Sequence, residues 1–335
     1  MKYKYIFKNY IDIFIHIIVL RRIFLNKILI LKNEDNDFER YISGKMRTDY
    51  VEVCAPYKKI GKLLRYIRMV CTRLHIHIFM GIWLNSWKYK LGNYETIILF
   101  DNGASERLLK WIKKEYPLCK LKVWLWNVPS KPVDIFKKYA DVYCFDEKYS
   151  LEHGFNYLEQ FYFEVGKQDK CKIQYDLSFV GQDKGRYEII KDVALFLKNN
   201  NRCFFFYVVN KKISKKDVYR QRKNIIKVMN REIPYEKVIK IVQESKAVFE
   251  IVKEGQEGIT LRTLEAMFYK KKLVTNNKYI KKYEWYNPDN IFILGIDRLD
   301  MIINFLDSPF VDIDKRTLKR HTYKNWLKSL TDDIQ

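Results

Sequence analysis

Residues 254–277, EGQEGITLRTLEAMFYKKKLVTNN, combine residue types that could bind a nucleotide. A helix that begins near Thr260 would offer its unpaired N–H groups and a hydroxyl to an anion. Arg262 adds a planar, bidentate donor that suits phosphate. Glu265, about one turn further along, could accept hydrogen bonds from two vicinal hydroxyl groups. Phosphate donors beside a diol acceptor fit a nucleotide, and the alternative is a well-capped amphipathic helix in which Glu265 pairs with a lysine.

A second stretch with related chemistry is YDLSFVGQDKGR, residues 175–186, which runs into a segment with helical periodicity. A strand, a glycine-containing turn and a helix suit an anion, because backbone N–H groups at a helix start can approach phosphate oxygens. Gly181 and Gly185 would supply the bend, while Lys184 and Arg186 would supply charge. Many βα turns contain glycine, so an ordinary turn is the alternative.

The elements that must position these residues alternate between short apolar strands and helices. The strands predicted in the first half are residues 26–33, 95–102, 121–129 and 140–146. Residues 104–117, between the second strand and the third, have apolar side chains at helical spacing. Strands that alternate with helices indicate a parallel sheet with helices on its faces.

Ligands of such sheets bind beyond the carboxyl ends of the strands. In the first half this edge would carry Asp101, Asn102, Gly103, Asn127 and Pro129. Asp101 is the candidate for chemistry there. The alternative for Asp101 is a cap on a helix over residues 104–114.

The alternation of strands and helices continues in the second half of the sequence. Strands are predicted at residues 203–209, 246–252, 271–277 and 290–295, and helices at 234–245 and 260–269. The predicted fold class is therefore α/β, with two Rossmann-like doubly wound domains in tandem. We expect an acceptor-side domain over 26–170, a second domain over 174–310, and a helical tail over 311–335 that could pack back on the first domain.

Residues 5–25 are apolar enough to raise the question of a membrane. Charged and polar residues interrupt the segment, its longest clean run is shorter than the ~20 residues that span a bilayer, and no small-residue cleavage site follows. Residues 1–25 could therefore lie in the interface of an anionic membrane. The alternatives are a first helix packed on the protein and an extension upstream of the true start.

The chain of 335 residues has 63 Lys+Arg against 40 Asp+Glu, a formal charge of +23. Such an excess favours an acidic partner: a nucleotide, a nucleic acid or an anionic membrane. The basic residues are spread along the whole length, and biased codon usage could account for many of them. Without a basic region, a zinc finger or an aromatic RNA-binding signature, the charge does not predict specific nucleic-acid binding.

The cysteines and histidines form no metal-binding motif. Six cysteines are widely separated without a C-x-x-C pair, which indicates buried thiols in a reducing compartment. His75 and His77 would share one face of a strand, but no further ligand accompanies them, so an ordinary polar edge is favoured over a metal site.

With these motifs in place, the chain resembles bacterial GT-B glycosyltransferases, in particular those of capsule, exopolysaccharide and lipopolysaccharide assembly. The resemblance rests on the glycine, threonine, arginine and glutamate of residues 254–277, on the upstream strand and loop of 175–186, and on YNPDNIFI at 286–293. It covers roughly residues 174–300 and matches the first domain only in general form. It implies two Rossmann-like domains facing a cleft, with a nucleotide-diphosphate sugar in the second and an acceptor in the first.

The resemblance also assigns residues to the site. Glu257 and Glu265 satisfy the E-x7-E spacing shared by many retaining members, which makes Glu257 a catalytic candidate beside Asp101. The donor-binding residues that it implies are Gly181, Lys184, Arg186, Gln256, Gly258, Thr260, Arg262 and Glu265.

The reaction implied is departure of a nucleotide diphosphate while an acceptor hydroxyl attacks. Helix N-terminal amides with Arg262 would neutralise the growing phosphate charge, a design that needs no divalent metal. No D-x-D ends a strand, and DIDK at 312–315 lies in the charged tail. An inverting reaction would need a general base, for which Asp101 is the first candidate and Glu106 the second. A retaining reaction would need no such base.

We therefore expect a glycosyltransferase that uses no cofactor and no metal and moves a sugar from a nucleotide-diphosphate donor, UDP first, to a glycan or lipid-linked acceptor. Its expected location is the cytoplasm, peripheral on the inner face of the cytoplasmic membrane, where an anionic surface is a further partner. Alternatives are a GT-B-shaped sugar-nucleotide epimerase, a basic nucleic-acid-binding protein and an inactive scaffold.

Overall fold

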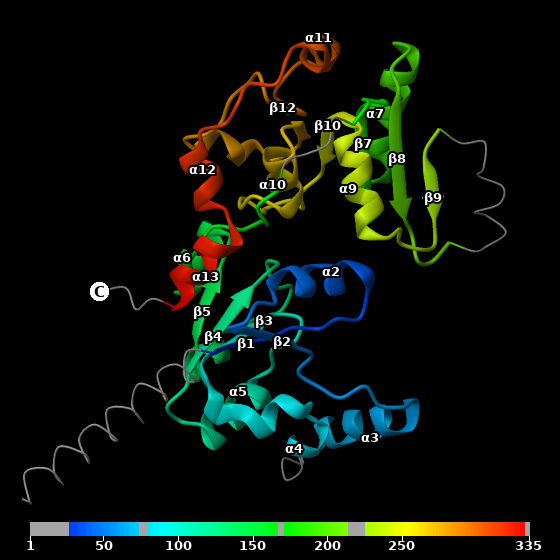
Figure 1. Cartoon of the computed structure of the whole chain (residues 1–335). Coiled ribbons are helices and arrows are strands. Elements are labelled where there is room, and N and C mark those ends of the chain that lie inside the picture. Colours follow the sequence, from blue (N-terminus) through cyan, green and yellow to red (C-terminus); the bar gives the residue numbers. More distant parts are fainter. Residues whose placement is uncertain (1–26, 74–79, 167–170, 214–224, 332–335) are drawn as a thin grey trace, which may run out of the picture. The chain divides into compact units, whose positions relative to one another are not determined.

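The computed structural model describes residues 27–73, 80–166, 171–213 and 225–331 (Figure 1). The chain divides into two compact units: unit 1 comprises Met1–Cys144 and Tyr149–Asn156, and unit 2 comprises Phe145–Lys148 and Tyr157–Gln335. The predictions for residues 1–25 and for His75 and His77 lie outside the described residues. The expected domain limits stay predictions.

Unit 1 is built on a six-stranded sheet in the order β2-β1-β3-β4-β5-β6. Its strands are β1 (Lys27–Leu31), β2 (Val51–Cys54), β3 (Tyr94–Phe100), β4 (Lys120–Leu125), β5 (Asp141–Cys144) and β6 (Asn156–Tyr157). The first five strands pair in parallel. Ile97, Ile98 and Leu99 of β3 are fully buried, as expected for a central strand covered on both faces.

Helices and 3₁₀ turns connect the strands of unit 1. They are α2 (Asp37–Met46), α3 (Lys62–Arg73), α4 (Met80–Trp83), η1 (Ser86–Asn93), α5 (Glu106–Glu115), η2 (Asp134–Lys138) and α6 (Glu147–His153), the last of which crosses between the units. The sequence predicted α5 but neither α2 nor β2. The four residues of β2 are too few for a periodic signal.

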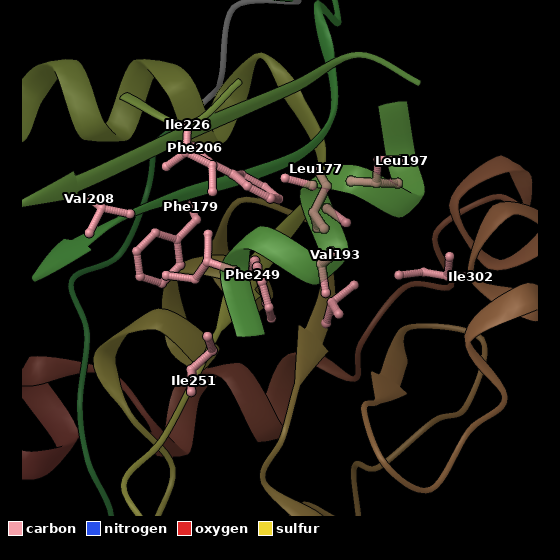
Figure 2. Packing of buried hydrophobic residues seen from close by; sticks show 14 of the residues in the cluster. Leu177, Phe179, Val193, Leu197, Phe206, Val208, Ile226, Phe249, Ile251 and Ile302 are labelled. Carbon is pink, nitrogen blue, oxygen red and sulfur yellow. The ribbon is translucent and has the colours of Figure 1, made fainter. Parts of the chain in front are cut away.

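Unit 2 has a second six-stranded sheet, in the order β12-β11-β10-β7-β8-β9, in which every neighbouring pair is parallel. Its strands are β7 (Tyr175–Gln182), β8 (Phe204–Val209), β9 (Lys227–Met229), β10 (Ser245–Glu250), β11 (Lys272–Thr275) and β12 (Ile291–Ile293). Figure 2 shows part of its core, where Leu177, Phe206 and Phe249 of three strands meet Val193 of a covering helix.

The helices of unit 2 follow their strands in sequence. They are α7 (Tyr187–Asn199), α9 (Tyr235–Gln243), α10 (Leu261–Phe268), α11 (Ile302–Asp307), α12 (Lys315–Arg320) and α13 (Tyr323–Thr331), with 3₁₀ turns η4 (Lys278–Lys282) and η5 (Leu299–Met301). All nine predicted strands and the predicted helices exist, with ends shifted by a few residues. The prediction of two doubly wound α/β domains is confirmed.

The C-terminal tail contacts the segment around Tyr162, which belongs to unit 2. The N–H of Tyr162 donates to the carbonyl of His321 over 2.8 Å, and the N–H of Tyr323 donates back to Tyr162 over 2.7 Å. Phe161 packs against Trp326 with ring centroids 4.3 Å apart. No helix among the described residues is long and apolar enough to cross a membrane.

Candidate active site

The loop after β10 leads into α10, and Thr260 caps that helix as the sequence predicted. Its hydroxyl oxygen accepts a hydrogen bond from the N–H of Arg262 over 3.0 Å. The same hydroxyl donates to Glu250, the last residue of β10. Thr260 therefore fixes the start of α10 to the carboxyl end of a central strand, the edge at which ligands of such sheets bind.

Glu250 is a buried acceptor that sequence reasoning missed. Only 3% of it is exposed, and besides Thr260 it accepts hydroxyl hydrogen bonds from Thr263 over 2.8 Å and Thr275 over 2.6 Å. A carboxylate surrounded by three hydroxyl donors is stabilised by these hydrogen bonds. The available signal was an acidic residue ending an otherwise apolar strand, with threonines at the start of the next helix and the end of the next strand.

Glu265, the predicted diol acceptor, is almost fully buried at 1% exposure. One carboxylate oxygen accepts from the hydroxyl of Tyr235 and the other from the guanidinium of Arg262. Burial raises the pKa of Glu265, and the charge of Arg262 opposes that rise. The alternative interpretation paired Glu265 with a lysine, but among the described residues the cation at Glu265 is Arg262. The role of Glu265 toward a ribose stays a prediction.

Arg262 connects α10 to the neighbouring strand. Besides Glu265, its guanidinium donates to the carbonyl of Val180, in β7, over 2.9 Å. Its side chain keeps 20% of its surface exposed. Arg262 thus holds the helix start against β7 while part of the guanidinium remains accessible, which is compatible with its predicted contact to phosphate.

The glycine turn after β7 is tight. The N–H of Arg186 donates to the carbonyl of Asp183 over 2.9 Å, and both central residues, Lys184 (φ 46°) and Gly185 (φ 80°), have left-handed backbones, as in a type I′ turn. Gly185 adopts this conformation without steric cost. Arg186 is then the N-cap residue of α7, so the turn brings Lys184 and Arg186 to the start of that helix.

Lys184, Arg186 and Lys253, which we call the basic trio, form a local excess of positive charge. Within the described ranges, no carboxylate lies at ion-pair distance from any of the three. Burial, and then the charges of Arg186 and Lys253, lower the pKa of Lys184. Burial also lowers the pKa of Arg186, which Glu250 and Asp183 partly offset. A phosphate bound here would relieve the mutual repulsion.

The loop that carries Gln256, Glu257 and Gly258 is held by Asp146, a second residue missed from sequence. Asp146 follows β5, is 2% exposed, and accepts from the N–H groups of Glu257 over 2.9 Å and Gly258 over 2.8 Å. A Cβ atom at Gly258 would lie 2.8 Å from the carbonyl oxygen of Phe145, so only glycine fits. Gln256 reaches the carbonyl of Gly258 over 3.5 Å.

Glu257 is the second catalytic candidate, and its carboxylate faces two lysines. It lies 3.7 Å from Lys148 and 3.7 Å from Lys282. Its side chain is 15% exposed. These two lysines balance the charge of the Glu257 carboxylate. Its catalytic role stays a prediction.

Asp101 lies directly after β3 in unit 1, and its carboxylate is tied to neighbouring loops. It accepts from the N–H of Asn102 over 2.9 Å and from the N–H of Asn127 over 3.1 Å. Burial raises its pKa, while these hydrogen bonds oppose the rise. The helix-cap interpretation is wrong, because Ser105 caps α5 through the N–H of Leu108.

The second candidate for the general base, Glu106, is exposed, and its carboxylate accepts a hydrogen bond from the hydroxyl of Tyr139 over 3.4 Å.

Lys32, directly after β1, was not singled out from sequence. It is 2% exposed, pairs with Glu39, and its ammonium lies 5.9 Å from the centre of the Phe100 ring. Burial lowers the pKa of Lys32 to about 8, against the opposing charges of Glu34 and Asp101. The carboxyl edge of unit 1 therefore brings a buried cation into the electrostatic environment of Asp101.

Two further sequence observations concern metals. In the part of the chain that the structure describes, no group of three His, Cys, Asp or Glu side chains is arranged to hold a metal ion. In the DIDK segment, Asp312 pairs with Lys270 over 2.6 Å and Asp314 caps α12. Both aspartates thus have structural roles in the tail.

Comparison with known proteins bears on the fold. The sequence matches no protein-family model and no curated protein. Among solved structures, an α-glucosyltransferase in complex with UDP and a 13-mer DNA containing an HMU base aligns with a TM-score of 0.52 at 11% identity, over 91% of this chain and 95% of that chain.

The same comparison finds the α-glucosyltransferase in complex with UDP and a 13-mer DNA with a central A:G mismatch, with a TM-score of 0.50, 11% identity, and 90% and 93% of the two chains covered. AviGT4, a glycosyltransferase involved in avilamycin A biosynthesis, aligns with a TM-score of 0.49 at 11% identity, over 92% of this chain and 99% of that chain. At such identities the likeness concerns architecture. This chain has the GT-B-like fold, two Rossmann-like doubly wound domains.

Proposed function

We propose that this protein is a glycosyltransferase that transfers a sugar from a nucleotide-diphosphate donor bound by unit 2. The observation that carries the proposal is the basic trio beside the start of α7, at the carboxyl edge of the sheet that also presents the capped start of α10. Two helix N-termini and unmatched cations favour a diphosphate. The GT-B-like fold and the motif resemblance support sugar transfer as the reaction.

In this proposal, Lys184 and Arg186 bind the phosphates, with Arg262 as a further guanidinium donor. Their charge stabilises the diphosphate as it departs, because fixed cations and helix amides interact most strongly where negative charge develops. The design supplies this charge from protein groups, so we propose a metal-independent reaction. UDP is our first choice of nucleotide, since the solved α-glucosyltransferase complexes of similar fold contain UDP.

The proposed role of Asp101 is that of a general base for the acceptor hydroxyl. Its burial raises its pKa toward the range in which a carboxylate accepts a proton effectively. A reaction that retains the anomeric configuration would need no general base, so Asp101 would have a structural role and Glu257 would be the more important residue for catalysis. The acceptor that we propose is a glycan or a lipid-linked sugar of cell-surface polysaccharide synthesis, met on the cytoplasmic face of the membrane.

The experiment that tests the proposal is thermal unfolding of the full chain with UDP, GDP, CDP, dTDP, CMP and a short DNA duplex. A ligand at about 100 times its dissociation constant stabilises a protein by about 2.7 kcal/mol, which raises the midpoint by several degrees. We expect one nucleoside diphosphate to give this shift and DNA to give none. The absence of any nucleotide shift would contradict the proposal.

Product analysis then distinguishes sugar transfer from epimerisation of the sugar nucleotide, the other reaction that this fold could support. The preferred nucleotide-sugar is incubated with the protein, with and without a mixture of oligosaccharide and lipid-linked acceptors. A transferase forms a glycosylated product only when an acceptor is present, whereas an epimerase changes the sugar nucleotide alone. A salt-sensitive DNA shift without a nucleotide shift would instead favour nucleic-acid binding, in line with the charge of +23.

A further inference from the structure

Helix α3 of unit 1 carries an apolar stripe that the described part of the protein leaves uncovered. Leu63 is 74% exposed, Tyr66 60% and Ile67 40%. With Val70, which is half-buried, they occupy positions i, i+3, i+4 and i+7, which lie on one face of a helix. An amphipathic helix normally turns this face into a core, so its exposure indicates a partner.

The segment around α3 is strongly basic. Between Glu52 and Glu95 the sequence contains no Asp or Glu, while its basic residues are Lys58, Lys59, Lys62, Arg65, Arg68, Arg73, Lys88 and Lys90. Lys58, Lys59 and Lys62 are exposed at the beginning of the helix. The guanidinium of Arg68 lies 4.9 Å from the ring centre of Tyr57, which ties the helix to the connection that follows β2.

We propose that α3, with Lys58, Lys59 and Lys62, is a binding surface for an anionic lipid bilayer. The helix would lie in the headgroup region, with Leu63, Tyr66 and Ile67 toward the acyl chains and the lysines at the phosphates. Apolar burial and attraction to anionic lipid together set the strength of such binding. The proposal concerns residues 58–70 of the sequence, whereas the membrane expectation of the sequence analysis concerned residues 1–25, and it does not depend on the proposed sugar transfer.

The combination of side chains favours a bilayer over the other acidic partner, nucleic acid. A phosphate backbone would satisfy the lysines, but it would leave Leu63 and Ile67 in water, since nucleic-acid surfaces are bound by cations and aromatic stacking. A bilayer accepts both kinds of side chain at once. A second copy of the chain would bring two basic segments together, which charge repulsion disfavours.

The test begins with sedimentation of the full chain with vesicles. One set contains equal phosphatidylglycerol and phosphatidylcholine, and the other contains phosphatidylcholine alone. We expect the double variant L63Q/I67Q to lower the partition coefficient onto anionic vesicles on the order of tenfold. The matched control is L118Q/L151Q, which makes the same change at two other exposed leucines, 89% and 78% exposed, and should bind as the wild type.

A second pair of variants tests the charges. K59E/K62E should lower binding to anionic vesicles by about tenfold or more. Added salt should reduce the difference in binding between this variant and the wild type, because salt screens the attraction between the lysines and the lipid phosphates. K110E/K114E, two exposed lysines of α5 in the same unit, is the matched control with the same change in net charge. Equal losses in both variants would mean that net charge alone drives binding, which would overturn the proposal.

Hydrogen exchange measured by mass spectrometry gives the local readout. The amides of residues 62–73 should exchange more slowly with anionic vesicles, while those of 106–115 should not change. If 62–73 is unprotected although the chain sediments, another segment binds the membrane and the proposal is wrong. Protection of 62–73 by DNA, or by raised protein concentration without lipid, would identify a nucleic acid or a second copy as the partner and would also overturn it.

Discussion

The carboxyl edges of the two sheets have the same topology but balance their charges differently. In unit 2, Lys184, Arg186 and Lys253 lie close enough to lower the pKa of Lys184, with no carboxylate at ion-pair distance among the described residues. In unit 1, Lys32 is paired with Glu39, and Asp101 accepts hydrogen bonds from the adjacent loops. The first edge has cations to offer an anion, whereas the second has a carboxylate with a raised pKa.

This difference indicates that the fold sets the position of a ligand site, whereas the local charges determine which kind of ligand the site suits. Parallel sheets bring loops together at one edge whatever their sequence. An edge with unmatched cations suits a diphosphate, and an edge with a half-buried carboxylate of raised pKa suits a hydroxyl that must lose a proton. Three substitutions test whether the two edges divide the work in this way.

The largest expected effect is on turnover in Asp101→Asn. A general base contributes about 10²–10⁴-fold, so we expect turnover to fall by that factor while the affinity for the nucleotide stays unchanged. Steady-state kinetics together with calorimetric titration of the nucleotide would check both parts. Asp141→Asn, at the amino end of β5, is the matched control and should retain activity. Normal turnover in Asp101→Asn would leave its carboxylate only the role of ordering Asn102 and Asn127.

The next effect is on stability in Glu265→Ala. Removing this carboxylate leaves Arg262 without its buried partner and Tyr235 without its acceptor, so we expect the free energy of unfolding to fall by about 3–5 kcal/mol. Denaturant unfolding measures this loss, and Glu236→Ala, a first-turn acid of α9, is the control. A stability equal to the wild type, with nucleotide affinity lost, would show that Glu265 serves the ligand alone.

The smallest of the three effects is on affinity in Arg186→Ala. A hydrogen bond to a charged group contributes about 1.5–3 kcal/mol, so the dissociation constant of the nucleoside diphosphate should rise roughly 10- to 150-fold with stability unchanged. Lys191→Ala, on the same helix but paired with Glu188, should bind as the wild type. If both variants bind equally well, the basic trio is not the phosphate site and the contrast between the two edges fails.

Local patterns in the sequence were sufficient for the alternating architecture. Apolar runs such as residues 95–102 and helical periodicity such as that of α7 do not depend on distant partners, and both appear as predicted. Thr260 as the cap of α10 was likewise readable, since capping involves residues within one turn. Among the elements that were missed, the strands β2 and β9 have four and three residues, too few to show a period.

The sequence by itself therefore determined the two parallel α/β domains, the turn at Gly185 and the start of α10, because each depends on neighbours along the chain. The prediction that Gly181 shares this bend was wrong, because Gly181 lies within β7. Only the tertiary structure decided the partners of the charged groups. Asp146 reaches the N–H of Glu257 across 111 residues, and Glu250 meets Thr275 across 25. It also decided that Glu265 is buried against Tyr235 and Arg262. Burial and pairing depend on which segments the fold brings together, and no local pattern records that.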